Sequence, residues 1–415
     1  MYDWANSAFA TTIMAGFFPV FFKQYWSAGA DVTLSTARLG MANSLAGLLV
    51  ALFAPILGAV ADNGTSKKRF LFFFAYLGIV MTSALFLVSK GNWPMAVLFY
   101  VMATVGFSGG NIFYDSLITG VASENNVDSV SALGFSAGYL GGGILFAANV
   151  WMTLRPGLFG FPGPGEAVRF SFLSVGIWWA FFSIPLFLYV REPGKGAGPN
   201  GWDTVKGGFS QLLGTFREAG SHRNIFLFLA AYWLYIDGVD TIIRMAVDYG
   251  ISIGFESNDL IVALLITQFV GFPSTFGFIY LGQRTGVKRA VFIAIAAYLF
   301  VSLWGAFITN RGEFYVLAII IGMVQGGIQA FSRSLYARII PVEKSAQYFG
   351  FYNMLGKFAV IIGPVLMGGV GLAIKSIGYN ANTAARASIM SISFLFLAGA
   401  ILFYFVKEER VGDRY

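Results

Sequence analysis

Apolar residues along the chain gather into twelve stretches, each long enough to cross a lipid bilayer as a helix. A bilayer core of about 30 Å needs roughly 20 apolar residues, because each helical residue rises about 1.5 Å. The stretches run near 4–26, 39–61, 70–88, 94–118, 130–152, 170–190, 224–247, 259–281, 290–308, 314–337, 347–373 and 387–406. The pattern predicts an all-α membrane protein with twelve transmembrane helices.

The composition supports a membrane protein and excludes several other classes. Of 415 residues, 57% are hydrophobic and 11% are charged, whereas a soluble domain has about 45–50% and about 25%. The mean hydropathy of +0.71 excludes both a soluble enzyme and a disordered chain. The chain has no cysteine and one histidine, His222, which excludes disulfides and multi-histidine zinc sites. We expect no metal and no cofactor.

The formal net charge of +7 has a topological explanation that needs no nucleic-acid partner. If both termini are cytoplasmic, the cytoplasmic segments hold roughly twice as many Lys and Arg residues as the opposite side, as the positive-inside rule requires. The charge therefore predicts a multi-pass protein of a bacterial inner membrane with both termini in the cytoplasm. We expect a monomer.

The longest polar stretch, 191–223, separates six predicted spans from six others. We therefore expect one six-helix bundle over 1–190 and a second over 224–415 with a short cytoplasmic tail. Within the polar stretch, Trp202, Val205 and Phe209 recur at helical spacing. This favours an amphipathic helix on the inner membrane surface. A disordered linker is the alternative.

Identical residues recur at a constant offset in the two halves. Pro55 and Pro273 are 218 residues apart, and so are the motifs Phe113-x-x-Ser116-Leu117 and Phe331-x-x-Ser334-Leu335. Matches at one offset in corresponding spans indicate two parallel, pseudo-symmetric six-helix repeats, as in major facilitator transporters.

The loop between the second and third spans resembles the cytoplasmic signature of the major facilitator superfamily. It reads Gly58-Ala59-Val60-Ala61-Asp62-Asn63-Gly64-Thr65-Ser66-Lys67-Lys68-Arg69. Gly64 comes one residue earlier than in the usual pattern, and the counterpart loop from Gly282 lacks the acidic residue. The resemblance implies that Asp62, with Lys68 and Arg69, latches the cytoplasmic side in one conformational state. A short, positively charged cytoplasmic turn is the alternative.

Three further motifs are similar to the vacuole-effluxer-like family, relatives of the fungal autophagy-linked vacuolar amino-acid exporter. They are Tyr2-Asp3-Trp4-Ala5-Asn6-Ser7-Ala8-Phe9, Tyr235-Ile236-Asp237-Gly238-Val239-Asp240-Thr241-Ile242-Ile243-Arg244, and Phe331-Ser332-Arg333-Ser334-Leu335-Tyr336-Ala337-Arg338 followed by Tyr348-Phe349-Gly350-Phe351-Tyr352. The resemblance implies a major facilitator fold and export of small solutes, amino acids in the fungal branch. It does not assign a substrate in bacterial relatives.

Three charged residues lie inside the seventh span, where each costs about 2.5–3.5 kcal/mol on insertion scales. The spacing places Asp237, Asp240 and Arg244 on one helical face. Asp240 and Arg244 can pair directly, which leaves Asp237 without a partner in its own helix. Because a carboxyl in a poorly hydrated cavity can exchange a proton near neutral pH, we predict that Asp237 couples transport to protons. A structural ion-pair network is the alternative.

Four more residues complete the predicted substrate- and proton-binding set. Asp3 and Asn6 share a face of the first span, the repeat counterpart of the seventh, although Asp3 could equally be an acid favoured at a helix start. Lys357, inside the eleventh span, must face a cavity or an anion. It is a candidate for binding a substrate carboxylate, with a pair to a nearby Asp as the alternative. Tyr114 lies near the inner end of the fourth span.

Asp115 and Arg333 occupy equivalent positions in the two repeats, 218 residues apart. Their opposite charges predict a salt bridge that closes the cytoplasmic side when the inner ends of the two halves meet. A pair between Arg333 and the loop residue Glu343 is the alternative.

Together these features predict a secondary active transporter that moves a small polar solute, such as an amino acid, by alternating access with proton coupling. Its partners would be the small-molecule substrate, protons and membrane lipids. The alternatives are a transporter of larger sugar or peptide cell-wall fragments and a lipid-handling flippase of the same fold. The sequence holds no hydrolase-type catalytic cluster, so an enzyme is not expected.

Overall fold

The computed structural model describes residues 1–63, 67–121, 127–190, 222–340 and 360–407, together with Tyr348, Phe351, Tyr352, Leu355, Gly356 and Phe358. Every regular element within these ranges is a helix, which confirms the all-α prediction. The chain forms two units, one of Met1–Ser35 and Leu52–Gly208 and one of Thr36–Ala51 and Phe209–Tyr415. Of the predicted linker 191–223, only His222 and Arg223 lie within the described residues.

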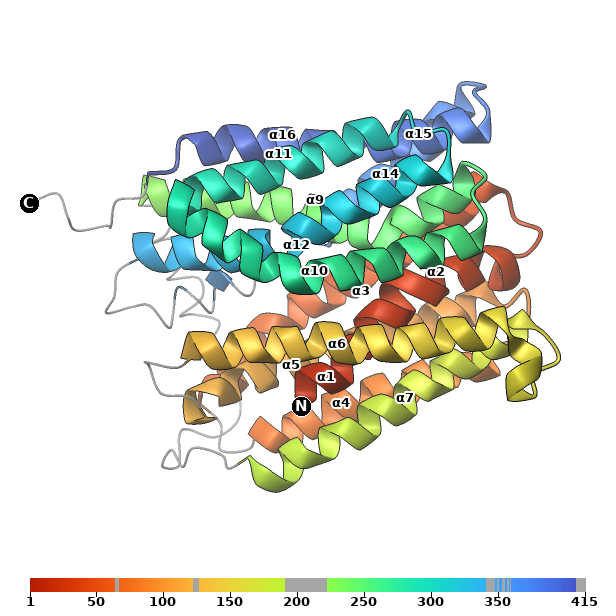
Figure 1. Ribbon diagram of the computed structural model, residues 1–415, viewed down its shortest axis with the longest axis horizontal. Helices are drawn as coiled ribbons and strands as arrows, with labels where there is room; N and C mark the ends of the chain where they lie inside the picture. The colour runs from red at the N-terminus through yellow and green to blue at the C-terminus, as the bar shows by residue number, and fades with distance from the viewer. Residues whose placement is uncertain are drawn as a thin grey trace, which may run out of the picture. The chain divides into compact units, whose positions relative to one another are not determined.

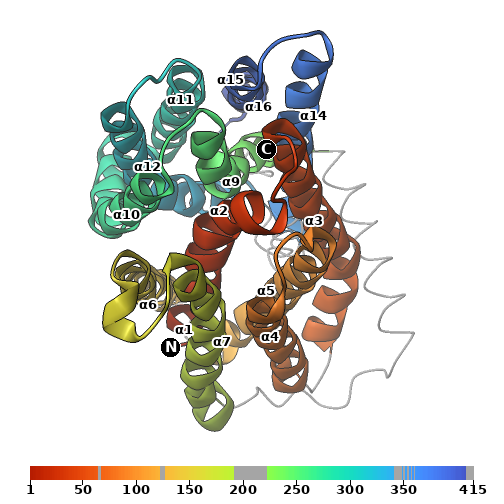
Figure 2. The same ribbon diagram turned by 90° about the vertical axis from the view of Figure 1, so that its right-hand side faces the viewer.

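The first unit contains the elements up to α7, apart from the middle of α3 (Figures 1 and 2). They are α1 (Tyr2–Ala8), η1 (Phe9–Phe17), α2 (Phe18–Phe21), η2 (Phe22–Trp26), α3 (Val32–Asn63), α4 (Lys67–Ala84), η3 (Leu85–Leu87), α5 (Trp93–Val121), α6 (Val127–Leu154), η4 (Pro156–Phe159) and α7 (Pro164–Tyr189).

The second unit contains Thr36–Ala51 of α3 and the helices from α9 onward. These helices are α9 (Arg223–Ser252), α10 (Ser257–Thr285), α11 (Val287–Gly305), α12 (Arg311–Ile339), α14 (Ile362–Ser376), α15 (Ala381–Ser391) and α16 (Ser393–Tyr404). Residues 36–51 lie against α9 and the start of α14 through the contacts described below.

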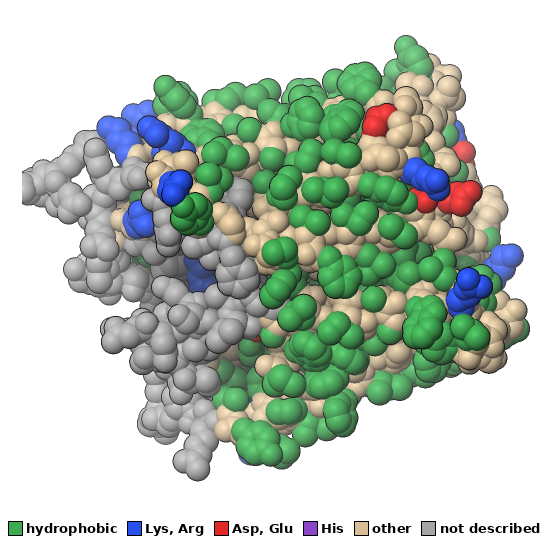
Figure 3. Space-filling model, viewed as in Figure 1, with side chains coloured by type: hydrophobic (Ala, Val, Ile, Leu, Met, Phe, Trp, Pro, Cys, Tyr) green, Lys and Arg blue, Asp and Glu red, His purple; other side chains and the backbone are tan. Residues whose placement is uncertain are grey.

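Ten helices in the described part of the chain are long and apolar enough to cross a membrane. On the face drawn in Figure 3, hydrophobic side chains cover most of the described surface, and the Lys, Arg, Asp and Glu side chains lie mainly toward the left and right of the view. Outside this set, α10 has 29 residues and α14 has 15. In the eleventh predicted span, 347–373, α14 begins only at Ile362.

The first span is helical, as predicted, but much of it is a wide π-helix. In η1 and η2 the backbone bonds to the fifth residue back, as when Phe18 N–H donates to the Ile13 carbonyl and Ser27 N–H donates to that of Phe22 at 2.8 Å. Pro19 lies between the two π segments and has no N–H to donate. Because π-helices are rare and mostly short, hydrophobic periodicity had not predicted this geometry.

In the first unit, two cations join α4 to α7. Lys68 Nζ, at the start of α4, donates to the carbonyls of Phe187 (2.6 Å) and Val190 (2.9 Å) at the end of α7. Arg169, near the start of α7, donates through Nε and Nη2 to the Phe86 carbonyl at 3.1 and 2.8 Å. Because the last carbonyls of a helix lack partners within it, Lys68 caps the end of α7, and Arg169 caps η3, the short helix that follows α4.

The second unit repeats this arrangement. Lys288 Nζ, at the start of α11, donates to the carbonyls of Tyr404 and Val406 at the end of α16. Arg386, on α15, donates to the carbonyls of Ala306 (2.7 Å) and Ile308 (2.9 Å) just after α11. Lys288 follows Lys68 by 220 residues and Arg386 follows Arg169 by 217. This shared capping pattern supports the repeat that the sequence predicts.

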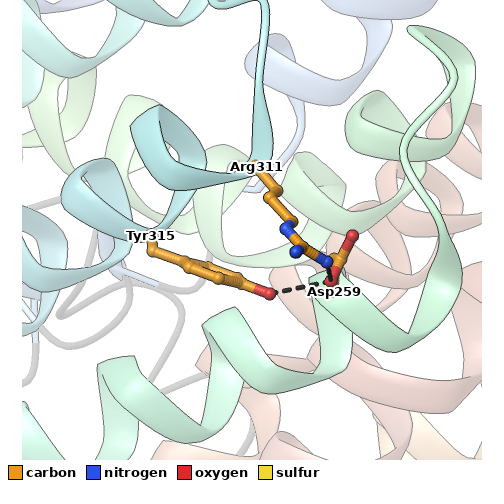
Figure 4. Close-up of polar contacts among 3 residues, drawn as sticks. All are labelled: Asp259, Arg311 and Tyr315. Atoms are coloured by element: carbon orange, nitrogen blue, oxygen red, sulfur yellow. Dashed lines mark hydrogen bonds and ion pairs between the residues drawn. The ribbon is translucent and has the colours of Figure 1, made fainter.

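An exposed ion pair lies between the starts of α10 and α12 (Figure 4). Arg311 Nη1 lies 3.5 Å from Asp259 Oδ1, and the Tyr315 hydroxyl donates to the same oxygen at 2.9 Å. Arg311 is 71% exposed, so this pair contributes about 0–1 kcal/mol to stability.

Candidate functional site

A polar face runs along α9 inside the seventh predicted span. Asp237, Thr241 and Asp248 on this face are buried, and Asp240 and Arg244 are half-buried. Buried ionisable groups in a membrane span are costly and mark functional sites. The sequence analysis had missed Asp248, because it ended the seventh span at residue 247, whereas α9 continues to Ser252.

The buried carboxylate of Asp237 accepts three hydrogen bonds. The backbone N–H groups of Ile362 and Gly363 donate to Oδ2 and Oδ1, each at 2.9 Å, and the Thr241 hydroxyl donates to Oδ1 at 3.3 Å. The expectation that Asp237 lacks a partner in its own helix is therefore wrong. Thr241 lies one turn further along α9, and the other two donors come from the amino end of α14.

Arg244 contacts an amide instead of the carboxylate that the sequence analysis had suggested. Among the described residues, the partner of its guanidinium is Asn43 Oδ1 on α3, at 3.5 Å from Nη1. The direct Asp240–Arg244 pair is not formed. The Asn43 amide also donates to the Leu39 carbonyl at 3.2 Å. Asn43 is buried, so a fixed amide orients the guanidinium.

Residues 36–51 of α3 supply further polar partners to the second unit. The Thr36 hydroxyl donates to Asp248 Oδ2 at 2.6 Å, and the Ser44 hydroxyl donates to the Ile361 carbonyl at 3.0 Å. At Gly40 a β-carbon would lie 2.6 Å from the Pro364 carbonyl oxygen, so only glycine permits this close approach. No sequence motif had pointed to these residues, because single hydroxyls and glycines are common in membrane helices.

In the first unit, α1 presents a carboxylate and an amide to α5. The Tyr114 hydroxyl donates to Asp3 Oδ2 at 2.6 Å, and Asn6 Nδ2 donates to Asn111 Oδ1 at 2.6 Å. Three predicted site residues, Asp3, Asn6 and Tyr114, thus belong to one polar cluster. Asn111 is a member that the sequence analysis had missed, although it lies three residues before Tyr114 on the same face of α5.

Glycines of α6 allow α1 to approach closely at the same cluster. A β-carbon at Gly134 would lie 2.5 Å from Asp3 Oδ2, and one at Gly138 would lie 2.5 Å from the Ser7 hydroxyl oxygen. Small residues permit such backbone approaches between membrane helices. The Asp3 carboxylate therefore lies against Gly134 of α6 as well as against the Tyr114 hydroxyl of α5.

The family model described as "Vacuole effluxer Atg22 like" matches residues 1–126 and 119–413 of the chain. The chain belongs to this family. It is 34% identical over 424 aligned positions to "Uncharacterized MFS-type transporter YxiO" of Bacillus subtilis, covering 100% of this chain and 95% of that protein. It is 24% identical to "Autophagy-related protein 22" of Yarrowia lipolytica, covering 78% of this chain and 69% of that protein.

Solved structures similar to this Atg22-like chain are membrane transporters. A D-xylose–proton symporter superposes with a TM-score of 0.73 at 13% identity, covering 99% of this chain and 98% of that one. The nucleoside transporter NupG superposes with a TM-score of 0.67 at 15% identity, covering 97% and 98%. These likenesses show the major facilitator fold. The Atg22-like chain is a multi-pass membrane transporter of the MFS type and not an enzyme.

The remaining predicted residues of the Atg22-like chain lie apart from these two clusters or outside the described side chains. Lys68 caps α7, and Arg69 is exposed at the start of α4. Arg333 is exposed on α12, whereas the side chains of Asp62 on α3 and Asp115 on α5 lie outside the described part, as does Lys357. The Asp115–Arg333 pair and the Asp62 latch therefore stay predictions. Within the described residues no group of three or more His, Cys, Asp or Glu could hold a metal.

Proposed function

We propose that the chain is a proton-coupled secondary transporter of a small polar solute of the amino-acid class. The observation that carries this proposal is that each unit holds an interior carboxylate packed against a glycine of a neighbouring helix, half-buried at Asp3 and buried at Asp237. Asp3 on the first span lies against Gly134 of the fifth, and Asp237 on the seventh lies against Gly363 of the eleventh. The proposal gives both carboxylates a role in binding protons or solute.

The surroundings of the two carboxylates are suited to proton exchange. Each accepts a hydrogen bond from a hydroxyl, that of Tyr114 for Asp3 and that of Thr241 for Asp237. Acidic residues in such interior positions commonly form proton relays in transporters. The one histidine, His222, precedes the seventh span, so carboxylates are the natural coupling groups of this chain.

The proposed solute carries a negative charge or is zwitterionic, because Arg244 supplies a half-buried cation on the α9 face. Lys357 is proposed as a second cation toward the same solute. Amino acids combine an ammonium and a carboxylate, and the family's description as vacuole effluxers agrees with a small solute as cargo.

The proposal is tested with purified protein in liposomes that carry an imposed pH gradient. A thermal-shift screen over amino acids, sugars and nucleosides first identifies the solute, since a ligand of the folded state raises its apparent stability. Asp237→Asn should then abolish pH-driven uptake and leave solute exchange measurable. The matched control is Glu256→Gln, which changes an exposed carboxylate before α10. Full pH-driven uptake by Asp237→Asn would assign coupling to another residue.

The solute charge has its own test. Neutralising Arg244 and Lys357 together should weaken binding of the solute by at least about tenfold, the effect of losing roughly 1.4 kcal/mol of interaction free energy. Binding is measured by scintillation proximity or calorimetry in detergent. An organic cation as the tightest ligand would contradict this part of the proposal.

A further inference from the structure

The amino end of α14 lies inside a predicted membrane span. The helix starts at Ile362, in the middle of the apolar stretch 347–373, and its N-cap residue, Ile361, makes no side-chain cap. The first N–H groups of any helix lack partners within the helix. In a membrane these donors need acceptors within the protein or in a hydrated cavity, because lipid offers none.

Asp237 satisfies the donors at this helix start. Ile362 and Gly363 supply the first two N–H groups of α14, and each donates to a different oxygen of the Asp237 carboxylate. The third residue, Pro364, has no N–H. One side chain from α9, 125 residues earlier than Ile362, therefore caps α14 in trans.

The fit around this cap is close on two sides. A β-carbon at Gly363 would overlap the Thr241 hydroxyl oxygen and lie 2.8 Å from Asp237 Oδ1, so glycine is required there. On the other side, Ser44 of α3 donates to the carbonyl of Ile361. The residue before α14 and the first two residues of α14 are thus held by α3 and α9 together.

We propose that Asp237 is a positioning residue that caps α14 only while its carboxylate is ionised, so that protonation of Asp237 releases the amino end of α14. An ionised carboxylate offers an acceptor oxygen to each of the two N–H groups, and hydrogen bonds to a charged acceptor are roughly twice as strong as neutral ones. A protonated carboxyl turns one oxygen into a hydroxyl. One N–H then loses its partner in a low-dielectric setting.

This inference rests on the proposed function, because it assigns what the coupled proton does: it frees the half-helix in the eleventh span to change its angle or register. Other ionisable groups lie on α9 and on the elements packed against it. They are Asp240, Arg244 and Asp248 on α9, Arg38 on α3, Arg311, Glu313, Arg333 and Arg338 on α12, Lys375 at the far end of α14 and Arg386 on α15; α10 carries Asp259 and Arg284 only near its ends, and α16 has no charged residue. Of the described side chains, that of Asp237 is bonded to the α14 backbone at its start.

Hydrogen–deuterium exchange of the full-length protein in lipid nanodiscs tests the inference, with fragmentation that resolves Ile362 and Gly363. Wild-type protein is compared between about pH 5 and about pH 8.5, after correction for intrinsic exchange rates. Protection of these two amides should fall by about tenfold at low pH, the ratio expected when a charge-assisted bond becomes neutral or is lost. Amides later in α14 serve as the internal reference and should not change.

Asp237→Asn should show the low-pH exchange at every pH, because an asparagine side chain has one acceptor oxygen. Glu256→Gln, which changes an exposed carboxylate before α10, is the control and should keep the wild-type pH dependence. Ser44→Ala removes the hydrogen bond from Ser44 to the Ile361 carbonyl. It should raise the exchange of Ile362 and Gly363 at every pH and keep its pH dependence. Protection of Ile362 and Gly363 that is constant with pH in wild-type protein would overturn the inference, even if Asp237→Asn does not fold.

The inference and the proposed function can fail separately. If the exchange of Ile362 and Gly363 depends on pH but transport is not driven by a pH gradient, the pH-dependent cap stands and proton coupling is wrong. If transport is proton-coupled but the exchange of Ile362 and Gly363 does not change with pH, proton coupling stands. The proposal that protonation of Asp237 releases the start of α14 is then wrong.

Discussion

At the scale of single residues, the environment of each polar side chain was decided by residues far away in the sequence. Asp237 meets its backbone donors across 125 and 126 positions, and Asp3 meets Tyr114 across 111. The sequence placed Asp237, Asp240 and Arg244 on one helical face correctly, since helical spacing alone determines that. It could not reveal the Ile362 and Gly363 donors, because backbone N–H groups are the same at every non-proline position.

Gly141 allows a prediction about helix packing between α1 and α6. A β-carbon at Gly141 would lie 2.6 Å from the Trp4 carbonyl oxygen and 2.7 Å from the Trp4 ring. Since backbone cannot yield as a flexible side chain can, Gly141→Ala should destabilise the protein by about 1–3 kcal/mol. The measurement is the apparent unfolding temperature of purified protein in detergent.

The neighbouring Gly143 provides the matched control, because nothing lies within 4 Å of a β-carbon there. Gly143→Ala should be neutral or stabilising by up to about 1 kcal/mol, the usual gain of alanine over glycine in a helix. Equal unfolding temperatures for the two variants would contradict the packing of α1 on α6.

The Asp3–Tyr114 hydrogen bond supports a second residue-scale prediction. Tyr114→Phe removes the donor at 2.6 Å and should cost about 1–3 kcal/mol of stability, because a partly buried carboxylate loses a charge-assisted bond. It should also slow transport at least severalfold if the cluster binds solute or protons. Initial uptake rates and unfolding temperatures are measured together.

Tyr76→Phe is the control for that experiment. The Tyr76 side chain of α4 stacks on Phe72 with ring centroids 4.2 Å apart and makes no hydrogen bond within the described residues. Its loss of a hydroxyl should leave both readouts unchanged. A Tyr114→Phe variant that behaves like Tyr76→Phe would remove the polar cluster of α1 and α5 from the transport site.

At the scale of secondary-structure elements, the cationic caps that join α4 with α7, and α11 with α15 and α16, explain how neighbouring helices keep their relative register. The sequence analysis had interpreted Lys68, from its position after a signature loop, as part of a latch or as a positive-inside charge. The structure adds a role as capping residues for Lys68 and Lys288. That role depends on which helix end lies nearby, which the local sequence does not encode.

Removing either lysine should loosen its helix pair. Lys68→Met and Lys288→Met each leave two end carbonyls without a charged donor, and each should lower stability by about 1–3 kcal/mol. Arg69→Met and Arg289→Met are matched controls, since both arginines are exposed beside the lysines, and they should change stability by less than about 0.5 kcal/mol. Thermal unfolding followed by tryptophan fluorescence compares the four variants. Destabilisation by the arginine variants as large as by the lysine variants would contradict specific capping.

At the scale of the whole molecule, the repeat and the charge distribution predict the orientation in the membrane. The natural chain has no cysteine, so single cysteines can report it directly. Lys90→Cys and Thr309→Cys change exposed residues in predicted outer loops, and Lys407→Cys changes an exposed residue at the predicted inner end. An impermeant maleimide added to intact cells should label the first two and should label Lys407→Cys only after permeabilisation.

The opposite labelling pattern would invert the topology and show that the excess of basic residues does not set the orientation of this protein. Labelling of all three from outside would indicate mixed insertion. Each variant is first checked for wild-type unfolding temperature, so that labelling reports topology and not local unfolding.

The sequence by itself determined the helical class, the membrane setting and the family, because apolar length, composition and motif spacing are properties of the chain alone. The division into two six-helix repeats stays a prediction. Tertiary structure decided which groups meet. It bonded Arg244 to Asn43 instead of Asp240, brought Asp237 to the start of α14 and widened the first span into π-helix. These outcomes depend on satisfying every buried donor and acceptor at once, which requires the positions of helices distant in sequence.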